Sequence, residues 1–127
     1  MKFFELELNG KTIKFRLSSK DCLEIEEKKK CKMLDFIKDY SYTTIITLLR
    51  YLRKSETPNF SQDDACKLMD ELVDNGYTLE KIVFDVIYEA LVVSGFLTKE
   101  ELEETKRETQ EAEKIIAKKK AEVLQIQ

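Results

Sequence analysis

TLEKIVFDVIYEALVVSGFL, residues 78–97, is the stretch that decides the fold. Thr78 is placed to cap the amino end of a helix, and Gly95 is placed to end that helix in a left-handed conformation. The apolar residues between them leave only a thin polar stripe, made of Glu80, Lys81, Asp85 and Glu89. A helix that is apolar over most of its circumference must be surrounded by protein, and this one is too short and too often charged to span a bilayer. The stretch therefore predicts a central core helix.

The composition of the chain predicts one mostly helical, soluble domain. Three glycines and one proline in 127 residues favour helices, and a net charge of −3 is too small to indicate a polyanion or a membrane surface as a partner. The three cysteines are widely spaced and have no histidine to complete a zinc site, which indicates reduced thiols in an intracellular protein. Residues 1–17 alternate polar and apolar side chains, unlike a secretory signal.

Residues 3–17 predict a β-hairpin. Asn9-Gly10 suits a type I′ turn, in which both central residues need a positive φ. The register that runs outward from this turn pairs Glu7 with Thr12, Leu6 with Ile13, Glu5 with Lys14 and Phe4 with Phe15. It gathers an apolar face of Phe4, Leu6, Leu8, Ile13 and Phe15. A lone hairpin is marginal in water, so this face must rest on helices.

Capping residues divide the remaining chain into helices. Ser18, Ser61 and Thr98 are each followed by an acidic residue three positions later, as in a capping box. The expected helices cover residues 18–31, a short segment at 33–37, residues 42–54 after Ser41, and residues 61–74. For residues 43–47, which are rich in β-branched side chains, a strand is the competing prediction. The basic residues near position 54 favour the helix, because cations suit a helix carboxyl end.

The character of the chain changes after Thr98. Residues 98–127 are rich in Glu, Lys and Ala with few large apolar residues, which predicts a solvated terminal helix. The alternative is a partner-binding or self-associating extension. The fold class that follows is mainly α (α+β): an N-terminal hairpin on about four to five helices in residues 1–97, followed by a charged helical extension in residues 98–127.

The residues favour no enzymatic chemistry. No glycine-rich phosphate loop is present, no histidine can activate a serine or cysteine nucleophile, and no cysteines have the spacing of metal ligands. Adjacent carboxylates such as Asp63-Asp64 fall where a helix begins and need no further explanation. We therefore expect a protein that is not an enzyme, with no catalytic residue, cofactor or metal.

Four segments in a fixed order carry a resemblance. They are NGKTIKFRL at residues 9–17, SSKDCLEIEE at 18–27, YTTIITLLRYL at 42–52 and FSQDDACKLMDELVDNGYTLEKIVFDVIYEALVVSGF at 60–96. Together they resemble the tail assembly chaperones of long-tailed, siphovirus-type phages and prophages of Gram-positive bacteria. The resemblance covers residues 3–97, and the chain departs from the family at residues 26–32, where lysines replace a leucine and a glycine.

The resemblance implies a function without chemistry. Such chaperones coat the long, aggregation-prone tape measure protein, keep it soluble and help recruit tail-tube protein subunits around it. They act in the host bacterial cytoplasm and are absent from the mature virion. Many of these phages also produce a longer, frameshifted form, and Ala117-Lys118-Lys119-Lys120 is compatible with an A-rich slippery run. Coating a long client suggests self-association into a homo-oligomer, for which residues 98–127 are one candidate.

We hypothesise a groove for a client helix between the helices at residues 42–52 and 65–73. It is motivated by more large apolar residues than a small core needs, namely Met33, Phe36, Tyr51, Phe60 and Met69. Methionine and aromatic side chains suit adaptable recognition. The alternative is that all five belong to the core.

Two other functions remain open. The first is a helical adaptor or coiled-coil scaffold that acts through residues 98–127. The second is a small phage nucleic-acid-binding regulator that acts through the lysine run at residues 28–32. Nearby glutamates oppose this run and no aromatic residues interleave it, so a solvated helix face with no nucleic-acid partner is the preferred interpretation.

Overall fold

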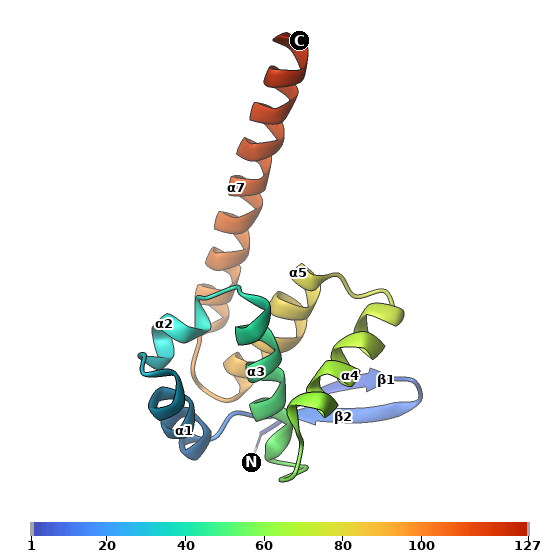
Figure 1. The fold of residues 1–127 in the computed structure, drawn as a ribbon, viewed down its shortest axis with the longest axis vertical. Coiled ribbons are helices and arrows are strands. Elements are labelled where there is room, and N and C mark those ends of the chain that lie inside the picture. Colours follow the sequence, from blue (N-terminus) through green and yellow to red (C-terminus); the bar gives the residue numbers. More distant parts are fainter. Residues whose placement is uncertain (1, 127) are drawn as a thin grey trace.

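The computed structural model describes residues 2–126, and the side chains within them except those of residues 113, 120 and 122–126. The elements, in chain order, are β1 (Phe4–Leu8), β2 (Lys11–Phe15), α1 (Ser19–Lys29), α2 (Met33–Ile37), α3 (Tyr42–Lys54), α4 (Gln62–Asp74), α5 (Leu79–Lys81), η1 (Ile82–Ile87), α6 (Tyr88–Val93) and α7 (Lys99–Ile126) (Figure 1). The predicted fold class, a hairpin followed by helices with a long C-terminal helix, is confirmed.

The predicted core helix is a continuous helix made of α5, η1 and α6. The Thr78 side chain caps it by accepting a hydrogen bond from the Lys81 N–H at 3.2 Å, and Gly95 follows its end with a φ of +89°. Outside the polar stripe, most side chains of this helix are buried, among them Ile82, Val86 and Leu91, which have no exposed surface. Its middle, η1, is a π-helix, which the apolar pattern did not predict.

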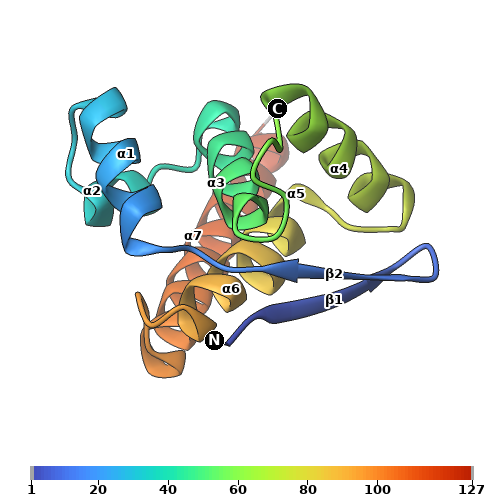
Figure 2. The same ribbon diagram turned by 90° about the horizontal axis from the view of Figure 1, so that it is seen from below.

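The hairpin has the predicted register, with Phe4 opposite Phe15 and Glu5 opposite Lys14. Asn9 and Gly10 have φ angles of 53° and 76°, as the type I′ turn requires. The Arg16 N–H donates to the Leu52 carbonyl at 2.9 Å, which ties the end of the hairpin to α3. The hairpin lies on the side of the body opposite to the tip of α7 (Figures 1 and 2).

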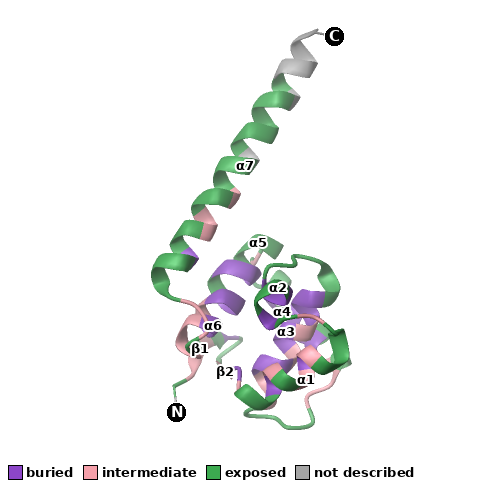
Figure 3. Ribbon diagram, turned by 90° about the vertical axis from the view of Figure 1, so that its left-hand side faces the viewer, coloured by how far each residue is buried: buried purple, intermediate pink, exposed green. Residues whose placement is uncertain are grey.

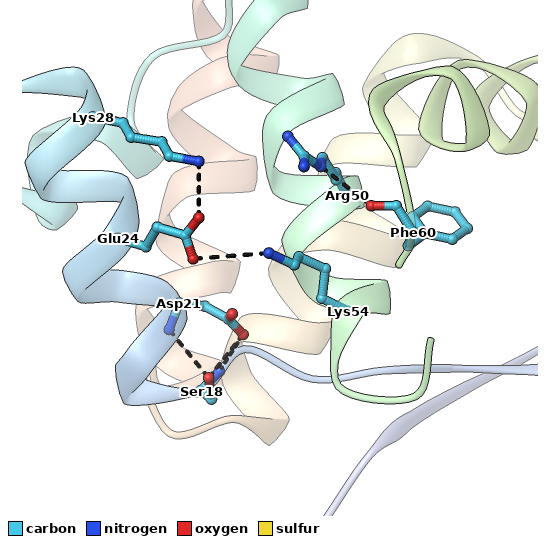
Figure 4. A network of polar contacts seen from close by, with 7 residues as sticks. All are labelled: Ser18, Asp21, Glu24, Lys28, Arg50, Lys54 and Phe60. Atoms are coloured by element: carbon cyan, nitrogen blue, oxygen red, sulfur yellow. Dashed lines mark hydrogen bonds and ion pairs between the residues drawn. The ribbon is translucent and has the colours of Figure 1, made fainter. Parts of the chain in front are cut away.

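The predicted caps are confirmed, because reciprocal bonds join Ser18 with Asp21, Ser61 with Asp64, and Thr98 with Glu101. Residues 43–47 are helical, so the competing strand prediction is wrong. A polar network joins α1 to α3 across their surface (Figure 4). In it, the Glu24 carboxylate lies 2.8 Å from Lys28 Nζ and 3.8 Å from Lys54 Nζ.

Three large apolar side chains at helix ends are exposed. The exposed fractions are 55% for Tyr42, 53% for Val73 and 44% for Leu79. All three lie in the first or last turn of their helix, where the chain turns toward a loop. Helical spacing shows which face of a helix is apolar. It does not show how far along the helix the elements packed against that face extend.

The long helix α7 belongs to the body only at its beginning. Leu102 is 1% exposed and joins the core, whereas almost every described side chain after Gln110 is exposed (Figure 3). The helix projects well beyond the other elements (Figure 1). The predicted boundary at residue 97 lies in the connection between α6 and α7.

Because Leu91 is fully buried in the core helix, Leu91→Ala should leave a cavity and lower the free energy of unfolding by about 2–5 kcal/mol. Leu23→Ala is the matched control, since Leu23 is 63% exposed on α1 and should change stability by no more than about 0.5 kcal/mol. Urea denaturation followed by circular dichroism measures both. Equal losses in the two variants would contradict the central position of the helix.

Candidate functional site

Three aromatic rings form a cluster beside the core helix. Phe84 and Tyr88 meet edge to face with ring centroids 5.5 Å apart, and Tyr40 lies 6.4 Å from each of them. The Tyr88 hydroxyl donates to the Ile37 carbonyl at 2.9 Å, which fixes α2 against the core helix. Burial, and then the hydroxyl of Tyr40, raise the pKa of Tyr88, so its phenol stays neutral and keeps this donor proton.

An apolar hollow of about 190 Å³ lies next to this cluster. We call it the aromatic groove. It is lined by Tyr40, Ile45, Leu79, Glu80, Val83, Phe84 and Thr109. Tyr40 and Leu79 are 47% and 44% exposed, so two large side chains at the groove face solvent. Exposed apolar groups gathered at a hollow mark a surface suited to binding an apolar side chain of another molecule.

The π-helix η1 supplies part of the wall of the groove. Val83 and Phe84 both lie in it, and its widened turn closes where the Tyr88 N–H donates to the Val83 carbonyl. A π turn holds one more residue than an α turn, so it changes which side chains face the groove, and such turns often occur at functional sites. Sequence reasoning missed the groove because no propensity signals a π turn.

Two further hollows lie along α7 and flank the aromatic groove. One, of about 320 Å³, shares Glu80 and Phe84 with it and is otherwise polar, and there Lys106 Nζ lies 3.5 Å from the Asp85 carboxylate. The other, of about 360 Å³, lies against α2 and has an acidic wall of Glu101, Glu104 and Glu108. The early turns of α7 therefore carry different charges on the two sides of the groove.

A hollow of about 200 Å³ also lies between α3 and α4, where we hypothesised a groove. Its walls are mixed in polarity and consist of Lys29, Tyr42, Thr43, Ile46, Thr47, Arg50, Gln62 and Cys66. None of the five nominated residues lines it. The residues from which we predicted a groove at this place are therefore not the residues that form the hollow.

Four of the five nominated residues lie in the core. Met33, Phe36, Tyr51 and Met69 are 2–7% exposed, and Phe60 is half-buried against the core. The Phe60 carbonyl accepts a hydrogen bond from Arg50 Nε at 3.2 Å (Figure 4). In this conformation the four buried side chains are not available to a partner, and their role in client binding stays a prediction.

The three cysteines differ in their surroundings. Cys66 is exposed at the hollow between α3 and α4, whereas burial, helped by the negative charges of Asp21 and Glu26, raises the pKa of Cys22 to about 11. At pH 8 the Cys22 thiol is therefore almost entirely protonated. Among the described residues no group of cysteine and carboxylate side chains is placed to hold a metal ion, and no helix is long and apolar enough to cross a membrane.

Because the thiolate is the reactive form, iodoacetamide at pH 8 should alkylate Cys66 much faster than Cys22. Peptide mapping by mass spectrometry after timed quenching measures both rates in one sample. The unfolded protein in urea is the control, since there the two rates should become similar. A faster reaction at Cys22 in the folded protein would contradict the burial of its thiol.

In comparisons with known proteins, the chain matches no family model, no curated protein sequence and no solved structure.

Proposed function

We propose that this protein is a tail assembly chaperone of a long-tailed phage or prophage. It binds the tape measure protein, keeps it soluble and helps recruit tail-tube subunits. The segments that resemble such chaperones, residues 3–97, form the hairpin and the helices of the body. The observation that carries the proposal is the aromatic groove, because a chaperone for an apolar helical client needs an exposed apolar surface on a stable body.

The size and lining of the aromatic groove suit a helix as its occupant. Its volume of about 190 Å³ is smaller than the roughly 300–1,000 Å³ of small-ligand pockets, so it accommodates one or two protein side chains. An amphipathic client helix would place an apolar residue in the groove and cover the exposed sides of Tyr40 and Leu79. Removing apolar client surface from water is the same process that prevents its aggregation.

Charges around the groove would orient the client. The polar hollow on one side has mixed charges, from Lys81, Lys106, Glu80 and Asp85. The acidic wall of α7 lies on the other side. Charges at the edge of an interface influence register and association rate more than affinity. A repetitive helical client could therefore be bound at many positions in the same direction.

The proposed setting is the host bacterial cytoplasm, where the chaperone leaves its client as the tail tube assembles and is absent from the mature virion. The chain acts by binding alone in this proposal, without catalysis or a cofactor. A second candidate is a helical adaptor, and it is favoured by one observation, the projection of α7 beyond the body.

Co-expression with the tape measure protein of the same genome tests the function. Tape measure protein that is soluble and co-purifies with this chain, but is insoluble without it, is the expected result. A client that stays insoluble and does not co-purify would contradict the proposal. Deletion of residues 111–127, which keeps the core residue Leu102 and the groove residue Thr109, would then separate the candidates, because an adaptor acting through the projecting part of α7 loses all of its partners.

Leu79→Asp tests the groove within the same experiment. It introduces a charge beside the groove, and because an acidic residue suits the first turn of a helix, the fold should be maintained. We expect the co-purified client to fall about tenfold, which corresponds to the loss of roughly 1.4 kcal/mol of binding. Leu23→Asp is the matched control, since Leu23 is 63% exposed on α1 and does not line the groove.

Unchanged client binding by Leu79→Asp, with thermal melts like that of the parent protein, would exclude the aromatic groove as the client site. A bulky maleimide on Cys66, in a Cys31→Ser background, then tests the hollow between α3 and α4. Loss of client on labelling, together with normal binding by Leu79→Asp, would move the client site to that hollow.

A further inference from the structure

The sequence of α7 is divided by charge. Residues 99–113 contain seven acidic and three basic side chains, whereas residues 114–127 contain four basic and one acidic. Acidic residues near the amino end and basic residues near the carboxyl end suit the helix dipole, but that effect acts only within the first and last turns. Glu108 and Glu111 lie well beyond the first turn of α7. The dipole therefore leaves most of this charge pattern unexplained.

The middle of the exposed part of α7 carries two large apolar side chains. Ile115 and Ile116 are 56% and 54% exposed. They stand at the centre of the sequence EAEKIIAKKK, residues 111–120. Counting outward from the point between the two isoleucines, position 111 corresponds to 120 and position 113 to 118, so each of these two glutamates corresponds to a lysine. At these positions the segment is complementary in charge to its own reverse, whereas Lys114 and Lys119 correspond to alanines.

We propose that α7 pairs with α7 of a second copy of this chain in antiparallel orientation, about a two-fold axis between Ile115 and Ile116. Such a contact is isologous, since each copy contributes the same surface. The four isoleucines form its apolar centre. On both sides of that centre, Glu111 and the glutamate at position 113 lie opposite Lys118 and the lysine at position 120 of the other copy.

The position of α7 relative to the body agrees with this pairing. About the same axis, residue 126 of one helix lies opposite residue 105 of the other, close to where α7 leaves the body. Thr105, Lys106 and Thr109 are half-buried, and almost every described side chain after them is exposed (Figure 3). The overlap thus uses the projecting part of the helix and places the two bodies at opposite ends.

The charge pattern of α7 and the position of the bodies both disfavour a parallel pair. It would place the acidic halves beside each other, and likewise the basic halves, and like charges on neighbouring helices repel. It would also bring the two bodies together at the same end. Charge complementarity therefore selects the antiparallel orientation, with a second copy as the occupant of this face. This inference is independent of the proposed function.

Charge reversal tests both the contact and its orientation. Sedimentation equilibrium of the full chain should show a reversible dimer at low salt that weakens as salt is added. Glu111→Lys with Glu113→Lys should raise the dimer dissociation constant by about tenfold or more, and so should Lys118→Glu with Lys120→Glu. All four changes together should restore the parent value, because every pair is then reversed and again complementary.

Ile115→Asp with Ile116→Asp should abolish the dimer, whereas Leu23→Asp, at a 63% exposed position on α1, should leave it intact. A parent chain that stays monomeric at every concentration would overturn the proposal. Charge reversals that leave dimerisation unchanged, as expected for a parallel pair, would also overturn it. A fourfold variant that fails to recover the dimer would overturn it as well.

Discussion

The structure depends on one constraint, which is that the helix of residues 79–93 is apolar on nearly all of its sides and must be enclosed. Ile82 and Phe84 lie on nearly opposite sides of it, because they are two positions apart, and both are buried, as is Leu91. No single neighbour can cover such a helix. The hairpin, α3 and the first turn of α7 each cover a part, and Leu102 shows that even the terminal helix contributes to the core. The fold is the arrangement that completes this enclosure.

The enclosure is incomplete at the amino end of the same helix. Leu79 is 44% exposed there, and Val83 and Phe84 line a hollow between α3 and α7. The core helix therefore supplies both the centre of the fold and part of an apolar surface that is open to solvent. The aromatic groove is built on packed helices, and the Tyr88 hydroxyl holds α2 beside it, so the groove is present in the chain on its own. Preformed sites bind with less loss of conformational freedom.

The sequence was most informative where structure is set by local contacts. The turn at Asn9-Gly10 determined every pair of the hairpin, and the capping residues located the starts of the helices, because both signals act within a few residues. The aromatic groove could not be predicted in this way. It depends on a π turn and on the path of α7 past Phe84, which are set by tertiary packing. The five nominated residues illustrate the same limit, since large apolar side chains such as Met69 are equally suited to a core and to a binding surface.

The most direct test of the central claim is hydrogen exchange of this protein with and without the tape measure protein, read by mass spectrometry. Our account predicts slower exchange in the complex for amides near Tyr40 and in the first turn of the core helix, residues 79–82, which border the aromatic groove. Protection confined to residues 42–50 and 62–66, around the hollow between α3 and α4, would contradict it. Unchanged exchange throughout the body would contradict it as well.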